Sequence, residues 1–272
     1  MADGSPDLSL SLLLDRSGIA VRYRALHFAV AACIAIAPFA SGLAQSGLSA
    51  PPVAPPCSDV SFIGLRGSGE SATENQGMGE VPEALFRLFA GERVAAIGLP
   101  YDASRSSGKD KTAAQQAVDD GARIFIQAVN DRSNSCPAEQ IVAVGYSLGA
   151  DVLGDALTTT ASPRIVAAVL FADPWFNPSD TATAVGTFDS SFGGDRGQRA
   201  PYAARLAPRV RSYCRRGDVI CQANAPGATK SEHGRYAPDQ VCEAAKFVAS
   251  RIGMRAPACR GSSGTAESVV GT

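Results

Sequence analysis

The chain has 272 residues, of which 45% are hydrophobic and 19% charged, so it can bury a sizeable core and is not expected to be disordered. Its 25 basic and 26 acidic residues leave a net charge of −1 at pH 7. This balance excludes a generally basic nucleic-acid-binding protein. We expect a monomer without a nucleic-acid partner.

The N-terminal 44 residues have the pattern of an export signal. Arg22 and Arg24 precede an apolar stretch over 25–40, and the small residues Gly42 and Ala44 stand three and one positions before a cut after Ala44. A buried helix or a membrane anchor is the alternative, but Pro38 interrupts the apolar run. We therefore expect a secreted, extracellular protein without an integral membrane span after processing.

Residues 1–20 fit poorly in front of such a signal, so we hypothesise that translation starts at Val21. N-terminal sequencing of the unprocessed precursor tests this. A Pro-rich linker over 45–56 is expected to follow the signal. The folded domain is then predicted over 57–259, with a flexible tail over 260–272.

Six cysteines remain once Cys33 leaves with the signal: Cys57, Cys136, Cys214, Cys221, Cys242 and Cys259. An even number in an exported chain predicts three disulfides, and spacing alone selects none of the 15 possible pairings. There is no C-x-x-C motif, and one histidine remains after processing. We therefore expect neither a metal site nor a cofactor.

Apolar runs alternate with helical patterns along the rest of the chain. Buried strands are predicted at five places, over 60–67, 94–101, 141–147, 165–174 and, shorter, 209–214. Apolar residues spaced 4, 3 and 4 apart predict helices over 118–129 and 241–252, and a shorter helix is expected over 82–89. This alternation predicts an α/β fold with a doubly wound, mostly parallel sheet and helices on both faces. Its site should lie at the C-terminal ends of the strands.

A candidate nucleophile follows the third predicted strand. Residues 145–149 read Gly-Tyr-Ser-Leu-Gly, and a sequence that can continue as a helix follows. Strand, sharp turn and helix together form the nucleophile elbow that exposes a serine hydroxyl, here that of Ser147. An ordinary glycine-rich turn is the alternative.

A serine nucleophile needs a base and an acid. Outside the predicted signal the one histidine is His233, in a polar loop before the last helix. In this type of site the acid lies between serine and histidine in the chain. Of the aspartates in that interval, Asp173 and Asp218 lie at or just past the end of a predicted strand. Asp218 follows the later strand and stands between two cysteines, whereas Asp173, next to Pro174, could simply brace a turn. We therefore prefer Asp218.

An oxyanion hole needs two donors aimed at the developing negative charge. One is expected to be the backbone N–H of Leu148, directly after the nucleophile. The loop over 66–70 follows the first strand, and Ser68 could add its N–H and its hydroxyl. The alternative for this loop is a plain Gly/Ser turn.

Five segments, in this order, resemble the cutinase family of serine esterases: FIGLRGSGE, CPAEQIVAVGYSLGA, FADP, YCRRGDVIC and HGRYAPD. They extend over about residues 57–251. The resemblance implies the cutinase-like α/β-hydrolase fold without a lid domain. It also implies a triad of Ser147, Asp218 and His233 and an oxyanion hole of Ser68 and Leu148. The disulfides it implies are Cys57–Cys136 and Cys214–Cys221, which leaves Cys242–Cys259.

Two features depart from that family. Leu148 replaces the glutamine common after the nucleophile, which keeps the backbone N–H but loses any bracing by the side chain. The segment GATKSEHGRY around His233 is more polar than the apolar rim of the active site in the better-known members. This difference argues against cutin itself as the substrate. Trp175 and Phe176 could line an acyl groove, although packing is the preferred interpretation.

The sequence therefore predicts a secreted serine esterase that acts through an acyl-enzyme on Ser147 and favours short to medium acyl chains. Its partner would be an ester substrate, whether a small ester, a polyester or a lipid. Segment 175–205 lacks the amphipathic pattern of an interfacial lid. The alternatives are a lipase or phospholipase of the same fold, a non-catalytic secreted or surface binding protein, and a thioester- or peptide-cleaving hydrolase.

Overall fold

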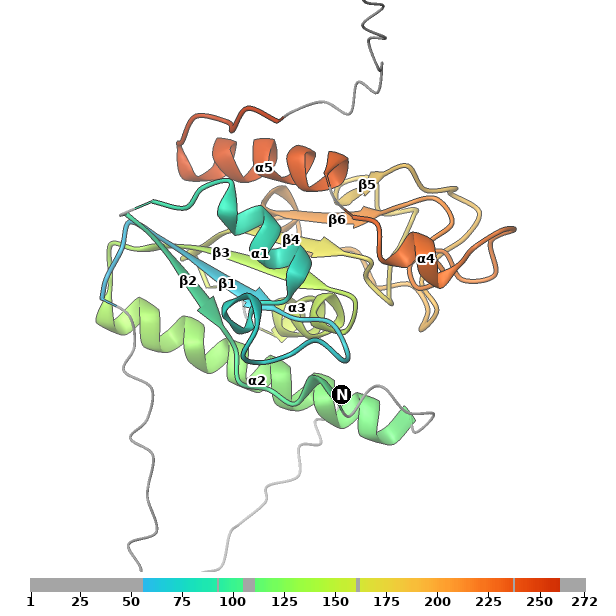
Figure 1. Cartoon of the computed structure of the whole chain (residues 1–272), viewed down its shortest axis with the longest axis horizontal. Helices are drawn as coiled ribbons and strands as arrows, with labels where there is room; N and C mark the ends of the chain where they lie inside the picture. The colour runs from blue at the N-terminus through green and yellow to red at the C-terminus, as the bar shows by residue number, and fades with distance from the viewer. Residues whose placement is uncertain (1–55, 92, 105–110, 160–161, 237, 260–272) are drawn as a thin grey trace, which may run out of the picture. The chain divides into compact units, whose positions relative to one another are not determined.

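A single sheet with helices on both faces makes up the part of the chain that the structure describes (Figure 1). The structure is a computed structural model and describes residues 56–91, 93–104, 111–159, 162–236 and 238–259. The predicted export signal, the linker up to residue 55 and the tail over 260–272 lie outside these ranges. None of the helices in the described ranges is long and apolar enough to cross a membrane.

The sheet has six strands in the order β2-β1-β3-β4-β6-β5, and neighbouring strands are parallel throughout. They are β1 (Val60–Leu65), β2 (Val94–Gly98), β3 (Gln140–Tyr146), β4 (Ile165–Phe171), β5 (Ala184–Gly186) and β6 (Val210–Cys214). The five predicted strands are confirmed, most of them ending a few residues early because the chain turns there into the loops of the site. β5 was missed because three residues are too few to give an apolar run.

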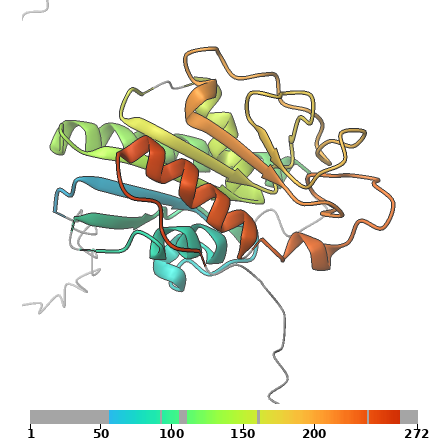
Figure 2. The same ribbon diagram turned by 90° about the horizontal axis from the view of Figure 1, so that it is seen from above.

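The helices are α1 (Glu80–Arg87), α2 (Lys111–Ser135), α3 (Leu148–Thr159), α4 (Lys230–His233) and α5 (Asp239–Ile252), with short 3-10 turns at Asn75–Gly77 and Ala207–Arg209. Figures 1 and 2 show α5 and α1 on one face of the sheet and α2 on the opposite face. The doubly wound α/β fold is thereby confirmed.

Two buried clusters hold these layers together. Side chains alternate between the faces of a strand, so Phe62 and Val142 pack towards α1 and α5, while Ile63 and Ala143 pack in the cluster that includes α2 and α3. This packing fixes the C-terminal ends of β1, β3 and β6 at the same edge of the sheet, where the loops of the site begin.

The polar segment around His233, predicted as a loop, contains the one-turn helix α4. Thr229 caps this turn, since its hydroxyl accepts a hydrogen bond from the backbone N–H of Glu232 at 3.2 Å. Figure 1 places α4 at the end of the sheet towards which the arrowheads of the strands point. Capping by a single threonine is a local signal that a search for apolar periodicity does not detect.

Three disulfides join the six cysteines of the described domain. Cys57–Cys136 links the start of β1 to the end of α2 across 79 residues. Cys214–Cys221 closes a loop of sequence separation 7. Cys242–Cys259 links α5 to the last described residue across a separation of 17.

Candidate active site

The turn between β3 and α3 holds Ser147 in a strained backbone conformation. Its φ angle is 55°, in the left-handed region that residues with a side chain rarely adopt. Its N–H donates to the carbonyl of Phe171 at 2.9 Å. A Cβ atom at Gly145 would collide with the backbone of Gly149, and one at Gly149 would collide with that of Leu65. Both glycines of the motif are therefore required by the close approach of α3 to β3 and β1.

His233 lies between Ser147 and Asp218 in the folded chain. Its Nε2 atom is 3.0 Å from the Ser147 hydroxyl, and its Nδ1 atom is 3.0 and 3.1 Å from the two carboxylate oxygens of Asp218. The histidine and the serine are 86 residues apart in the sequence. Hydroxyl, imidazole and carboxylate thus form the continuous hydrogen-bonded chain that acyl transfer by a serine requires.

Asp218 is completely buried and held by several donors. The backbone N–H of Ile220 donates to its Oδ1 atom at 2.8 Å, and the hydroxyl of Tyr236 donates to its Oδ2 atom at 2.5 Å. Burial raises the pKa of Tyr236 well above its ordinary value, so the phenol stays protonated and remains a donor. Tyr236 was missed by the sequence reasoning, although it stands three residues after His233.

Tyr146, the residue directly before the serine, contacts His233 through both its ring and its hydroxyl. Its ring stacks on that of His233 with centroids 5.1 Å apart, and its hydroxyl donates to the His233 carbonyl at 2.9 Å. The ring of Tyr236 meets that of Tyr146 edge to face. Burial and the nearby carboxylate of Asp218 raise the pKa of Tyr146. These contacts restrict the imidazole to one orientation.

The loop after β1 brings Ser68 to the same cavity as Ser147 and Leu148. The buried side chain of Arg66 donates to the carbonyls of Leu99, at 2.6 Å, and Tyr101. This brace fixes the start of the loop. Ser68 itself is exposed.

A carboxylate braces the other end of this loop. Glu70 accepts hydrogen bonds from the backbone N–H groups of Gly67 and, at 2.7 Å, of Glu80, the first residue of α1. Its two oxygens thereby join the loop to the N-terminus of a helix, a position that favours a negative charge. The loop is thus fixed at both ends while Ser68 stays open to solvent.

Asp173, the alternative acid, makes a different set of contacts. Its Oδ1 atom accepts the N–H of Trp175 at 3.0 Å, and its Oδ2 atom lies 3.4 Å from Arg199. It therefore braces a turn, as the alternative interpretation held. Phe176 is buried against Phe188 and the Cys214–Cys221 disulfide, so it packs and does not line a groove.

A small cavity of about 120 Å³ lies beside the serine. Its lining residues are Ser68, Ala114, Ser147, Leu148, Asp151, Pro174, Asp195, Arg196 and Ile220. Three of them, Asp151, Asp195 and Arg196, are charged and were not anticipated from the sequence. Burial raises the pKa of Asp151 to about 6 and also raises that of Asp195.

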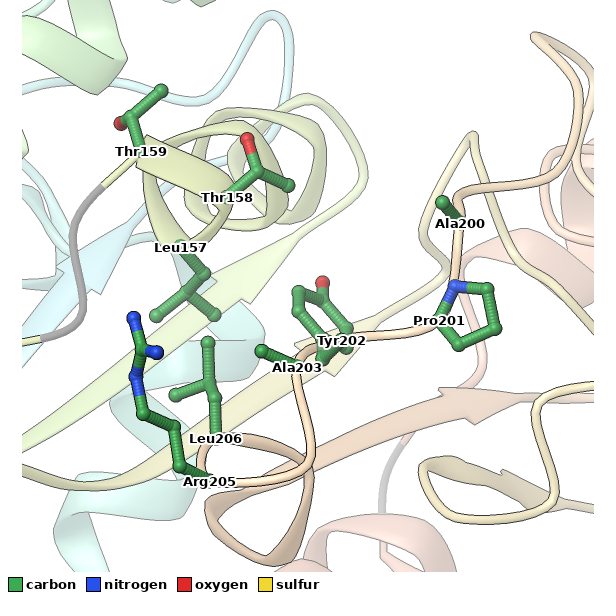
Figure 3. Close-up of a pocket in the computed structure, with 9 residues that line it drawn as sticks. All are labelled: Leu157, Thr158, Thr159, Ala200, Pro201, Tyr202, Ala203, Arg205 and Leu206. Atoms are coloured by element: carbon green, nitrogen blue, oxygen red, sulfur yellow. The ribbon is translucent and has the colours of Figure 1, made fainter.

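A second cavity, of about 290 Å³, lies at the opposite end of α3 (Figure 3). Its lining residues are Leu157, Thr158, Thr159, Ala200, Pro201, Tyr202, Ala203, Arg205 and Leu206. This set includes no histidine, cysteine or carboxylate, and Ser147 lies at the start of α3 instead. The cavity beside Ser147 is therefore the candidate active site.

Two disulfides are expected to contribute differently to stability and to activity. A double variant, Cys214→Ser with Cys221→Ser, should lose about 2–3 kcal/mol of stability, because its loop is short. It should lose at least about 100-fold in kcat, since a shift of about 1 Å in the position of Asp218 is costly.

The matched control is the double variant Cys57→Ser with Cys136→Ser. The disulfide that it removes spans a separation of 79 residues and joins the segments just before the N-terminal ends of β1 and β3. This double variant should lose more stability, about 4–5 kcal/mol, and keep its activity where folded. Urea unfolding and initial rates measure both effects. Equal activity in the two double variants would contradict the positioning role of the short loop.

Comparison with known proteins places the chain in a family. The model of the cutinase family matches residues 56–252. The chain belongs to the cutinase family. Phospholipase Culp4 of Mycobacterium tuberculosis is 29% identical over 238 residues, 87% of this chain and 95% of the relative. Acetylxylan esterase 2 of Talaromyces purpureogenus is 26% identical, over 72% of this chain and 88% of the relative.

A solved structure shares the fold of this cutinase-family chain. The catalytic core domain of the acetyl xylan esterase from Trichoderma reesei aligns with a TM-score of 0.61 at 23% identity, over 72% of this chain and 100% of that domain. At this identity the likeness concerns the fold.

Proposed function

We propose that this cutinase-family protein is a secreted serine esterase in which Ser147, His233 and Asp218 form the catalytic triad. Cutinases and acetylxylan esterases are carboxylic ester hydrolases, which supports the reaction class. The observation that carries the assignment is the placement of His233 Nε2 at 3.0 Å from the Ser147 hydroxyl, with Asp218 on the other ring nitrogen.

In the first half of the reaction, Ser147 Oγ attacks the ester carbonyl carbon while His233 Nε2 takes the hydroxyl proton. Asp218 holds the Nδ1–H of the ring and stabilises the imidazolium. The backbone N–H groups of Leu148 and Ser68 are proposed to bind the oxyanion. Collapse of the tetrahedral intermediate breaks the bond to the alcohol, which leaves with the proton from His233.

In the second half, His233 removes a proton from water, and the hydroxide attacks the acyl group on Ser147. The carboxylic acid leaves, and the proton returns to the serine. The cycle needs only these side chains, the oxyanion donors and water.

Secretion is supported by the three disulfides, which suit an oxidising compartment, and by the pattern of the N-terminal 44 residues. We further propose that the enzyme acts as a monomer on short to medium acyl chains. The small cavity beside Ser147 and the charged residues in its wall support this preference.

The test is a series of p-nitrophenyl esters, with a triglyceride emulsion and phospholipid vesicles alongside. We expect kcat/KM to be highest at about four to eight carbons, because the charged wall gives longer chains little of the roughly 0.8 kcal/mol that each buried methylene can gain. No jump in rate is expected at the solubility limit. If kcat/KM still rises for long acyl chains, or if phospholipid is the one substrate hydrolysed, the enzyme acts on lipids.

A further inference from the structure

A charged pair forms part of the wall of the cavity beside Ser147. Asp151 lies one helical turn after the serine on α3, and Arg196 comes from the segment between β5 and β6. The Nη1 atom of Arg196 donates to the Oδ2 atom of Asp151 at 2.5 Å, and their side chains are 23% and 3% exposed. The proposed hydrolytic cycle uses neither residue, so their presence in the wall calls for another role.

A backbone hydrogen bond and a second arginine hold this pair in place. The backbone N–H of Arg196 donates to the carbonyl of Pro174 at 2.9 Å. Arg199 provides a second cation 3.6 Å from Asp151. A Cβ atom at Gly154 would collide with the guanidinium of Arg199, so this glycine on α3 leaves the space that Arg199 fills.

Such a wall discriminates between substrates by their polarity. A hydrocarbon chain laid over an ion pair removes water from both charges and offers no hydrogen bond in return, which is unfavourable. An oxygen atom at the same place can accept a hydrogen bond from the guanidinium of Arg196. Arg196 is the less buried partner, so it is the charged group that an incoming acyl group can meet.

We propose that Arg196, held by Asp151, is the specificity-determining residue that restricts this site to short or oxygen-bearing acyl groups. The inference rests on the proposed esterase function and names the residue responsible for its chain-length preference.

The test compares Arg196→Met with the wild type on two pairs of p-nitrophenyl esters. The first pair is decanoate against butyrate. The second is methoxyacetate against butyrate, which are nearly the same size but differ by one oxygen in place of a methylene. Arg205→Met is the matched control, because Arg205 lines the second cavity at the far end of α3. Circular dichroism verifies folding, and Arg196→Gln takes over if the methionine variant does not fold.

In Arg196→Met we expect the kcat/KM ratio of decanoate to butyrate to rise about tenfold. A fully buried methylene is worth about fourfold, so this corresponds to one or two additional methylenes in contact with the wall. The ratio of methoxyacetate to butyrate should fall about fivefold. A variant whose cavity is merely wider would not show this second change, because the two acyl groups are nearly the same size. Arg205→Met should keep both wild-type ratios.

Ratios that stay within twofold of wild type in a folded Arg196 variant, while the wild type hydrolyses butyrate, would overturn this inference alone. A wild type inactive on every ester would overturn the proposed function, and this inference with it.

Discussion

Replacing Ser147 with alanine is expected to abolish ester hydrolysis while leaving the fold intact. Loss of the attacking oxygen removes the acyl-enzyme route, and removal of a nucleophile of this type costs on the order of 10⁶ in kcat. The side chain is small, and its main hydrogen bond is the one to His233. The backbone hydrogen bond from Ser147 to Phe171 does not depend on the side chain.

Initial rates on p-nitrophenyl butyrate and labelling by a fluorophosphonate probe measure this loss, and thermal unfolding verifies the fold. Ser68→Ala is the matched control, because it removes a serine hydroxyl from the same cavity but keeps the backbone N–H. It should lose far less activity and still be labelled. Near wild-type turnover in Ser147→Ala would show that another group is the nucleophile.

The second large effect is expected for Asp218→Asn, with a loss of about 10⁴ in kcat. An amide can donate to Nδ1 of His233, which would place the histidine proton on Nε2 and remove the acceptor for the proton of Ser147. The buried carboxylate also accepts hydrogen bonds from Ile220 and Tyr236. An asparagine oxygen can keep one of these contacts, so the domain should still fold.

The matched control for this change is Asp173→Asn. Asp173 is also buried and follows a strand, but its contacts are with Trp175 and Arg199. It should keep turnover within about tenfold. Initial rates and circular dichroism on both variants show which aspartate is the acid of the triad. A large loss of kcat in Asp173→Asn, with Asp218→Asn near the wild type, would assign this role to Asp173.

Local patterns predicted most of the architecture. Continuous apolar runs predicted four of the six strands, because a strand buried on both faces needs apolar side chains at every position. A shorter, alternating pattern over 209–214 predicted β6. The strained turn at Ser147 was foreseeable because glycines stand two positions before and two positions after the serine. His233 could be singled out because it is the one histidine outside the predicted export signal.

The missed features depend on contacts between distant segments. The hydrogen bond from Tyr236 to Asp218 joins residues 18 apart, and the ion pair of Arg196 with Asp151 joins residues 45 apart. A polar residue leaves no periodic signal, and its partner is set by how strands and loops meet in three dimensions. The sequence thus singled out the proposed reacting groups but not the residues that contact them or shape the cavity.

The distribution of the proposed catalytic groups along the chain has a consequence for the order in which the molecule is made. Ser147 and the loop at Ser68 are complete when a little over half of the chain exists, whereas His233 lies only six residues before α5. A chain still being synthesised therefore carries its hydroxyl without a partner base. Asp218 is held between Cys214 and Cys221, so oxidation of that pair belongs to the same late stage. The contact between base and hydroxyl thus forms among the last steps of maturation.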